Sequence, residues 1–191
     1  MIAFEFHWDD APDAGDPIEG ATLAQLTLRL DASTATRVYD RAARSEREAI
    51  FVPLYPLARW IVDQWWSLLY EPWSFDARLP GPGVAVSAAI RGWMERHCLR
   101  VAVPGYAVPY TCIYSQGVDL VLAQRADPGG RYMHTPVEFR ESLDVRGERE
   151  ALRLEFARLV SGVLERVEGI ADPRVASLRG DWRAICEAGT P

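Results

Sequence analysis

The sequence predicts an α+β fold in which an antiparallel sheet packs against a central tryptophan-rich helix, with C-terminal helices after it. Three observations lead to this class. Alternating apolar and polar residues near the N-terminus indicate paired strands, an almost wholly apolar segment indicates the central helix, and strands and helices follow in blocks rather than in strict alternation. We assign residues 1–169 to an α+β domain and residues 170–191 to a C-terminal helical appendage.

The first elements are strands. Residues 2–8 alternate strictly between apolar and polar side chains, which is typical of a half-buried strand. Residues 22–30 alternate again, so we expect the two segments to pair. The connection over 9–21 is rich in Asp, Pro and Gly and is predicted as a solvated loop. A third short strand is expected at 36–39, and residues 49–55 are rich in β-formers.

The central helix is predicted over residues 57–70, with Pro72 ending it. Apolar side chains recur with helical spacing and also fill most of the remaining positions. Only Arg59, Asp63 and Ser67 form a thin polar line. A helix that is apolar almost all round is expected to lie at the centre of the fold, with other elements packed on several sides.

The second half of the chain adds strands and then helices. The period of two over 108–114 and 118–123 predicts a hairpin, and Asp-Pro-Gly-Gly at 127–130 predicts a turn. Helices are expected over 84–97 and, with a long amphipathic stripe, over 146–168. A last helix is expected to begin at Asp172-Pro173, a good N-cap and first-turn pair.

The charge of the chain is concentrated at one end. The 191 residues include 27 acids and 21 bases, all of them arginine, for a net charge of −6. Without lysine, a Schiff-base enzyme, a phosphate-loop NTPase and a nuclease that needs a lysine are excluded. Residues 1–31 hold the whole acidic excess, so the first loop is expected to repel phosphate or to attract an arginine-rich partner.

Cysteine usage and hydropathy favour a cytoplasmic protein. Cys98, Cys112 and Cys186 lie far apart in the sequence without a CxxC pair, so we interpret them as reduced thiols rather than as a disulfide framework or a zinc site. No signal peptide or membrane-spanning segment is predicted, and no cofactor is expected.

Candidate catalytic residues are few. HExxH, GxSxG, GxxxxGK and GxGxxG are all absent. His7, Asp9 and Asp10, together with the acids of the first loop, form either a solvated turn or an oxygen-rich metal site. His97 is either a hydrogen-bonded core histidine or a base. It does not pair with Cys98, because adjacent residues on a helix point about 100° apart.

Two groups of residues are candidates for binding. Arg59 and Asp63 at i, i+4 form either a structural ion pair or a line that faces a partner. The tryptophan surplus adds a candidate protein interface at Trp66, Tyr70 and Trp73, with core filling as the alternative. The candidate nucleic-acid contact consists of four arginines, which Glu46 and Glu48 dilute: Arg37, Arg41, Arg44 and Arg47.

Several segments resemble a known family. They are TRVYDRAARS (36–45), VPLYPLARW (52–60), QWWSLLYEP (64–72) and RHCLR (96–100), followed by the Leu178–Trp182 step. These segments resemble the N-terminal region of bacterial ImmA/IrrE-type metallo-endopeptidases over about residues 34–187. In that family the chemistry belongs to a C-terminal zinc domain with HExxH, which this sequence lacks, so no zinc ligand carries over. The resemblance implies an accessory region, encoded either by a shorter gene or within a longer protein.

Three functions remain as hypotheses. The first is a non-enzymatic protein-interaction or adaptor module, for which the resemblance implies a place as a subunit of a bacterial defence, stress-response or mobile-element assembly. The second is a nucleic-acid-associated subunit that binds only within a larger complex. The third is a metal-dependent hydrolase built on His7, Asp9 and Asp10. The missing catalytic motifs favour the first, with a protein partner and no membrane.

Overall fold

The computed structural model describes residues 2–9, 15–31, 33–132 and 135–189, and they adopt the expected α+β class. The helices are α1 (Pro17–Ala21), α2 (Leu54–Asp63), α3 (Trp65–Tyr70), α4 (Ala88–His97), α5 (Leu99–Ala102), α6 (Arg149–Arg166) and α7 (Pro173–Ala188). The strands are β1 (Ile2–Trp8), β2 (Leu23–Leu30), β3 (Ser33–Thr34), β4 (Val38–Asp40), β5 (Ser45–Arg47), β6 (Ile50–Pro53), β7 (Tyr110–Gln116), β8 (Asp119–Arg125), β9 (Asp127–Tyr132), β10 (Thr135–Phe139) and β11 (Leu143–Glu148).

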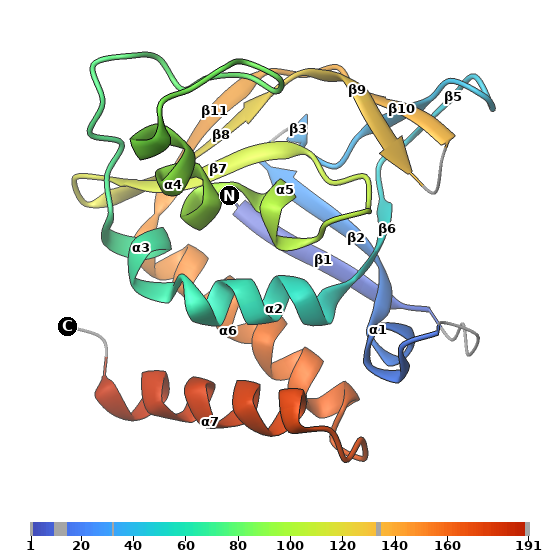
Figure 1. Cartoon of the computed structure of the whole chain (residues 1–191), viewed down its shortest axis with the longest axis vertical. Helices are drawn as coiled ribbons and strands as arrows, with labels where there is room; N and C mark the ends of the chain where they lie inside the picture. The colour runs from blue at the N-terminus through green and yellow to red at the C-terminus, as the bar shows by residue number, and fades with distance from the viewer. Residues whose placement is uncertain (1, 10–14, 32, 133–134, 190–191) are drawn as a thin grey trace.

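The strands form three small sheets, and within the described ranges every pairing between these strands is antiparallel. In the first sheet β2 pairs with β1 on one side and with β3 and β6 on the other. The second sheet has the order β5-β4-β10-β9, and the third has the order β11-β8-β7. In Figure 1 the sheets lie above α2, and α7 lies farthest from them.

The predicted pairing of the first two strands is confirmed. Their register runs from Ile2 opposite Leu30 to Trp8 opposite Ala24. The outer edge of β1 is covered by α6, because the Phe4 N–H donates to the Glu155 carboxylate at 2.9 Å and Arg158 donates to the Phe4 carbonyl. An open edge invites pairing with other chains, so these two side chains close this edge at Phe4.

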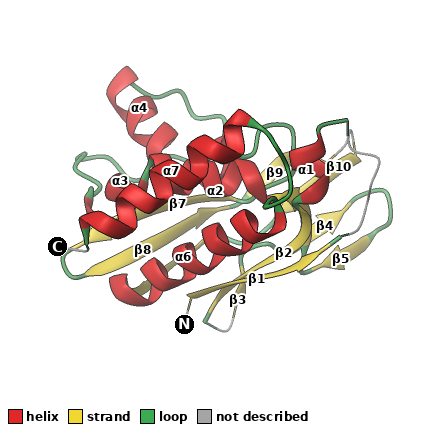
Figure 2. Ribbon diagram, turned by 90° about the horizontal axis from the view of Figure 1, so that it is seen from below, coloured by secondary structure: helices red, strands yellow, loops and turns green. Residues whose placement is uncertain are grey.

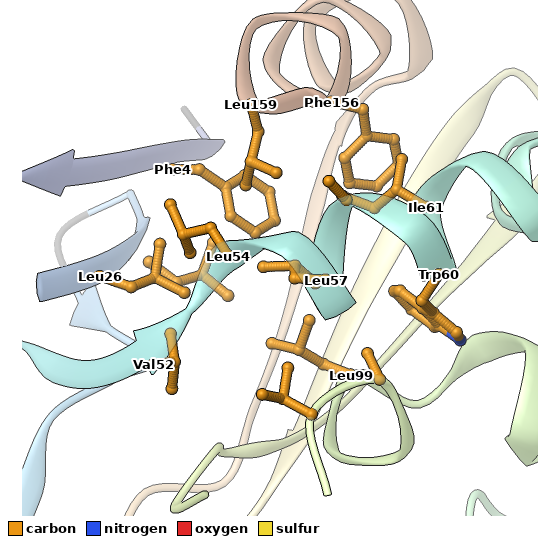
Figure 3. Close-up of a cluster of buried hydrophobic side chains, with 14 of the residues drawn as sticks. Phe4, Leu26, Val52, Leu54, Leu57, Trp60, Ile61, Leu99, Phe156 and Leu159 are labelled. Carbon is orange, nitrogen blue, oxygen red and sulfur yellow. The ribbon is translucent and has the colours of Figure 1, made fainter. Parts of the chain in front are cut away.

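The expected tryptophan-rich helix lies at the centre of the fold but is broken in two. Gln64, with φ −107° and ψ 14°, separates α2 from α3. Seven of the ten side chains of α2 are buried, and α2 packs on α6, α7, α1 and α5. Figure 3 shows Leu57 and Ile61 of α2 in the same cluster as Phe4, Phe156 and Leu159. The break lets α2 pack on α6 and α7, while α3 packs on β7.

The N-terminus of α2 is capped from a distant part of the chain. Its own N-cap residue is Pro53, which offers no side-chain hydrogen bond. The buried Thr22, just after α1, replaces it: its hydroxyl accepts from the Tyr55 N–H at 3.2 Å and its carbonyl accepts from the Leu54 N–H at 2.8 Å. The same hydroxyl donates to the Ile18 carbonyl at 2.8 Å, so one residue joins α1 to α2.

We therefore expect Thr22→Val to lower the free energy of unfolding by about 1–2 kcal/mol, because the valine leaves the Tyr55 N–H without an acceptor in a buried place. Urea unfolding followed by circular dichroism measures this change. Thr22→Ser keeps the hydroxyl and serves as the control, with a smaller loss. An unchanged stability of Thr22→Val would contradict the capping role.

The C-terminal helices pack directly on this core. Val175 and Leu178 of α7 are buried in it, and Trp182 contacts Trp65 edge to face with ring centroids 5.2 Å apart. Viewed from below in Figure 2, α6 and α7 lie in front of the strands. Among the described residues, no helix is both long and apolar enough to span a membrane.

Three local predictions differ from the structure. Residues 17–21 form α1 rather than open loop, because Asp16 accepts from the Ile18 N–H and Pro17 suits a first helical turn. Residues 127–132 form β9 rather than a turn; β9 is an edge strand, where Pro128 is tolerated. Residues 143–148 form β11, which pairs with β8 and so takes the start of the predicted helix over 146–168.

Candidate functional site

The candidate site is a groove along the exposed side of α2, which we call the α2 groove. It has an open volume of about 360 Å³. Four helices supply its lining: Glu19 from α1, Tyr55, Pro56, Arg59, Trp60 and Asp63 from α2, Val101 and Ala102 from α5, and Arg174 from α7. Tyr55, Trp60 and Ala102 are largely buried, whereas Val101 is 47% exposed. The groove therefore has an apolar floor with charged groups around it.

The two arginines of the α2 groove are held by carboxylates. Arg59 donates to Asp63 at 3.0 Å and to Asp181 of α7 at 2.7 Å. Arg174 binds Asp16 at 2.6 Å and Asp172 at 2.9 Å. The predicted Arg59–Asp63 pair is thus present, and it lines a groove, so the two interpretations of this pair are compatible.

Acidic groups outnumber basic ones at the α2 groove. Its lining residues and their direct ion-pair partners comprise two arginines and five carboxylates: Asp16, Glu19, Asp63, Asp172 and Asp181. The hydrogen bonds of Arg174 lower the pKa of Asp16 and of Asp172, and the hydrogen bond of Arg59 lowers the pKa of Asp181. With their lowered pKa values Asp16, Asp172 and Asp181 are charged at neutral pH, and these three alone exceed the two arginines of the groove.

Trp66 and Tyr70 of the predicted interface form an aromatic pair on α3, with Trp66 exposed and Tyr70 half-buried. Their rings stack with centroids 5.7 Å apart, and Trp66 is 45% exposed. The guanidinium of Arg149 lies 4.9 Å from the centre of the Tyr70 ring. The spacing Arg59, Asp63, Trp66 and Tyr70 corresponds to successive turns of a helix, although α2 and α3 are separated by the break at Gln64.

Trp73, the last residue of the predicted interface, belongs to a second aromatic cluster. Its ring contacts Phe75 and Trp93, each with centroids 4.7 Å apart, and its Nε1–H donates to the Ala77 carbonyl at 2.8 Å. It also borders a different open pocket, which includes Tyr114 and Arg125. The structure therefore does not place Trp73 with Arg59 and Asp63.

His97 is a buried, hydrogen-bonded histidine in this second cluster. Its Nδ1 lies 2.6 Å from the Ile113 carbonyl, its Nε2 lies 3.1 Å from the Glu71 carboxylate, and its ring stacks on Trp93 with centroids 4.0 Å apart. Arg96 holds the same carboxylate at 3.0 Å. The pKa of His97 is lowered overall, because burial outweighs the hydrogen bonds to Ile113 and Glu71, which act in the opposite direction. With no exposed ring atom, this group joins α3, α4 and β7 rather than meeting a substrate.

Three of the four predicted nucleic-acid arginines are engaged with carboxylates. Arg37 binds Glu48 and Glu141, Arg41 binds Glu138, and Arg47 binds Asp40. Arg44 lies at an exposed turn with a φ of 51°. Because acids accompany these arginines, the structure offers little free positive charge to a phosphate backbone.

The metal hypothesis falls partly outside the described residues. Asp10 and Asp13 belong to the segment 10–14, which is not described. His7 and Asp9 lie at the end of β1, and Asp16 and Glu19 belong to the helical turn of α1. Across the described ranges no group of three or more His, Cys, Asp or Glu side chains is placed to hold a metal ion.

Of the nine residues that line the α2 groove, the sequence predicts only Arg59 and Asp63 as site residues. Glu19, Val101, Arg174 and Asp181 come from segments 40 or more residues from Arg59 and carry no local motif. The one signal in the sequence was the acidic excess of the first 31 residues, to which Asp16 and Glu19 belong. Comparison with protein-family models, with curated proteins and with solved structures finds no match.

Proposed function

We propose that this protein is a protein-interaction module, without a catalytic role of its own, whose α2 groove receives an arginine-containing segment of a partner protein. The acidic excess around an apolar floor carries this proposal. Guanidinium groups pair with carboxylates in a bidentate manner, and their side chains also pack on aromatic surfaces such as the tyrosine and tryptophan of the floor. A phosphate-rich ligand would instead meet repulsion from the same carboxylates.

The α2 groove is lined by both apolar and charged side chains, which favours an extended segment as ligand. The apolar side chains of Pro56, Trp60 and Val101 offer contacts to aliphatic side chains. The carboxylates of Asp63 and Asp181 pair with Arg59 but remain 41% and 51% exposed, so each can accept from a further guanidinium. Buried apolar contacts surrounded by polar groups are the common arrangement of protein interfaces. The exposed Trp66, stacked on the half-buried Tyr70, offers a second aromatic contact, since tryptophan and tyrosine are enriched among residues that dominate binding.

The family resemblance supports a biological setting for this module. Residues 36–72 and 96–100 are similar to the N-terminal region of ImmA/IrrE-type metallo-endopeptidases, which implies an adaptor or accessory role. We therefore propose a cytoplasmic adaptor within a bacterial defence, stress-response or mobile-element assembly. Sequencing the gene and its neighbours tests this setting: an adjacent or continuous zinc-peptidase gene is the expected result, and unrelated neighbours would contradict it.

The binding test uses two labelled peptides, one alternating arginine with leucine and one alternating glutamate with leucine. We expect fluorescence anisotropy to show binding of the arginine peptide only. Asp63→Asn combined with Asp181→Asn should weaken it roughly tenfold, which corresponds to about 1.4 kcal/mol. A benzophenone side chain in place of Val101 should crosslink to the peptide, whereas one in place of Val118, which lies on the β7–β8 turn outside the groove, should not.

A matched control removes the same charge elsewhere. Asp144→Asn combined with Glu150→Gln neutralises two exposed carboxylates that pair with Arg125 and Arg153 outside the groove. If this control weakens binding as much as the groove variant, the attraction is only that of the net charge. Equal binding of the two peptides would refute the proposed ligand.

A further inference from the structure

Two buried cysteines face one another across the edge of the third sheet. Cys98, between α4 and α5, forms an isolated antiparallel bridge with Cys112 in β7. Both side chains are almost fully buried. From the sequence we expect these two cysteines to be separate reduced thiols. In the fold they are direct neighbours.

The backbone geometry of this bridge suits a disulfide. Residues opposite one another in an antiparallel pair have Cα atoms about 4.5–5.5 Å apart, and disulfides span about 4.4–6.8 Å between Cα atoms. The isolated bridge places the two backbones side by side at the level of the cysteines, which is the separation that a disulfide spans. The remaining cysteine, Cys186, is exposed on α7 and takes no part in this pair.

The electrostatic surroundings make one thiol the attacking group. The hydrogen bond from Cys112 lowers the pKa of Cys98, and the N–H groups of Arg100 and Val101 and the charge of Arg100 act in the same direction. The same hydrogen bond and burial raise the pKa of Cys112. An uneven pair of this kind contains a nucleophilic sulfur and a resolving sulfur, which thiol–disulfide exchange requires.

We propose that Cys98 and Cys112 are a site of reversible covalent modification that closes to an intramolecular disulfide when a small-molecule disulfide is present. The Cys98 thiolate attacks the small disulfide, forming a mixed disulfide and releasing one small thiol. Cys112 then gives up its proton and attacks the Cys98 sulfur, releasing the second small thiol. Two protein thiols are oxidised and one small disulfide is reduced to two thiols, so atoms and electrons balance.

The consequence falls on α5. This four-residue helix follows Cys98 directly, has no side-chain cap at its N-terminus and carries Val101 and Ala102. In the reduced protein the start of α5 is joined to β7 at Cys98 by the isolated bridge. The disulfide would add a covalent link to that backbone bridge, and a closed loop of this length stabilises a fold by reducing the freedom of the unfolded chain.

Both thiols are buried in the folded protein, so the test lets the disulfide form during refolding in a redox buffer, while the thiols are accessible. The reduced, unfolded chain is refolded with a mixture of oxidised and reduced glutathione, then denatured with an alkylating agent and analysed by mass spectrometry of its peptides. We expect a peptide pair that joins Cys98 to Cys112. The melting temperature should rise by several degrees, a reducing agent should reverse it, and amide exchange at residues 99–102 should slow.

Three variants give the proposal its controls. Cys186→Ser should keep both the linked peptide and the shift in melting temperature. Cys98→Ser and Cys112→Ser should each lose both effects, and comparing each variant with and without oxidant separates the disulfide from any change in packing. Refolded protein in which Cys98 and Cys112 are both alkylated, or carry only glutathione, would overturn the proposal, as would a linkage through Cys186 alone.

Discussion

Replacing Phe156 with alanine is expected to lower the free energy of unfolding by about 3–5 kcal/mol, the range measured for large aromatic side chains removed from cores. Phe156 is fully buried on the face of α6 that meets the sheet and the central helices. Its ring lies 5.8 Å from the Phe4 ring and 6.3 Å from the Trp65 ring, between centroids. The substitution therefore opens a cavity where β1, α3 and α6 meet, and little can move in to fill it.

Urea unfolding followed by both tryptophan fluorescence and circular dichroism measures this loss, and coincident transitions confirm that a single unfolding step is compared. The matched control is Leu154→Ala on the same helix, because Leu154 is 55% exposed. Its effect should stay within about 0.5 kcal/mol. If Phe156→Ala loses less than about 1 kcal/mol, the face of α6 is not packed as the structure describes.

The strands that the sequence predicts best are those with one buried face. A period of two is imposed by the sheet itself, so residues 2–8 and 22–30 could be paired from the pattern alone, and their register confirms it. The break at Gln64 could not be predicted, because the apolar pattern continues through it unchanged. The helices on the two sides of the break have different neighbours. The helix α2 contacts α6 and α7, whereas α3 contacts β7.

The candidate site likewise contains residues that the sequence predicts and residues that it does not. The pair of Arg59 and Asp63 could be predicted because both residues are on one helix, one turn apart. Asp181 and Arg174 could not, since they reach the α2 groove only after α7 has packed on α2. The same holds for Cys98 and Cys112, which are 14 positions apart and meet through a single bridge. Contacts that depend on tertiary packing leave no period in the sequence.

A second large effect is expected at Glu71, which joins three elements through one carboxylate. Arg96 and His97 of α4 both bind this carboxylate, and the backbone carbonyl of Glu71 accepts from the Ser115 N–H of β7 at 3.0 Å. Glu71→Ala removes the carboxylate against which the buried Nε2 of His97 and the guanidinium of Arg96 lie. Losing one partner of a buried hydrogen-bonded group commonly costs about 2–4 kcal/mol, and we expect a loss in that range.

The charge of Glu71 gives this effect a pH dependence. The hydrogen bonds of Arg96, and next those of His97, lower the pKa of Glu71 from 4.5 to about 2. A carboxylate whose pKa is lower in the folded state stabilises the fold above pH 4.5, and this contribution is lost as the pH falls from 4.5 toward 2. Because about a third of the side chain is exposed, solvent screening leaves about 2 kcal/mol at neutral pH.

The variant Glu71→Gln isolates that charge, because the amide keeps the shape of the side chain. Its deficit in unfolding free energy relative to the parent protein should be full at pH 7 and should shrink steadily between pH 4.5 and about pH 2. Burial also lowers the pKa of His97, and Glu71 acts in the opposite direction, so protonation of His97 below pH 6.5 opposes folding in both proteins and more strongly in the variant, which deepens the deficit between pH 6.5 and 4.5 before it shrinks. Urea unfolding at a series of pH values measures this deficit. The control is Glu150→Gln, which removes an exposed carboxylate that pairs with Arg153. Its unfolding free energy should stay close to that of the parent protein at every pH, because exposed ion pairs contribute little to stability. A Glu71→Gln deficit that does not vary with pH would contradict this prediction. It would show that the variant is destabilised by altered packing or hydrogen-bond geometry and not by the loss of the Glu71 charge.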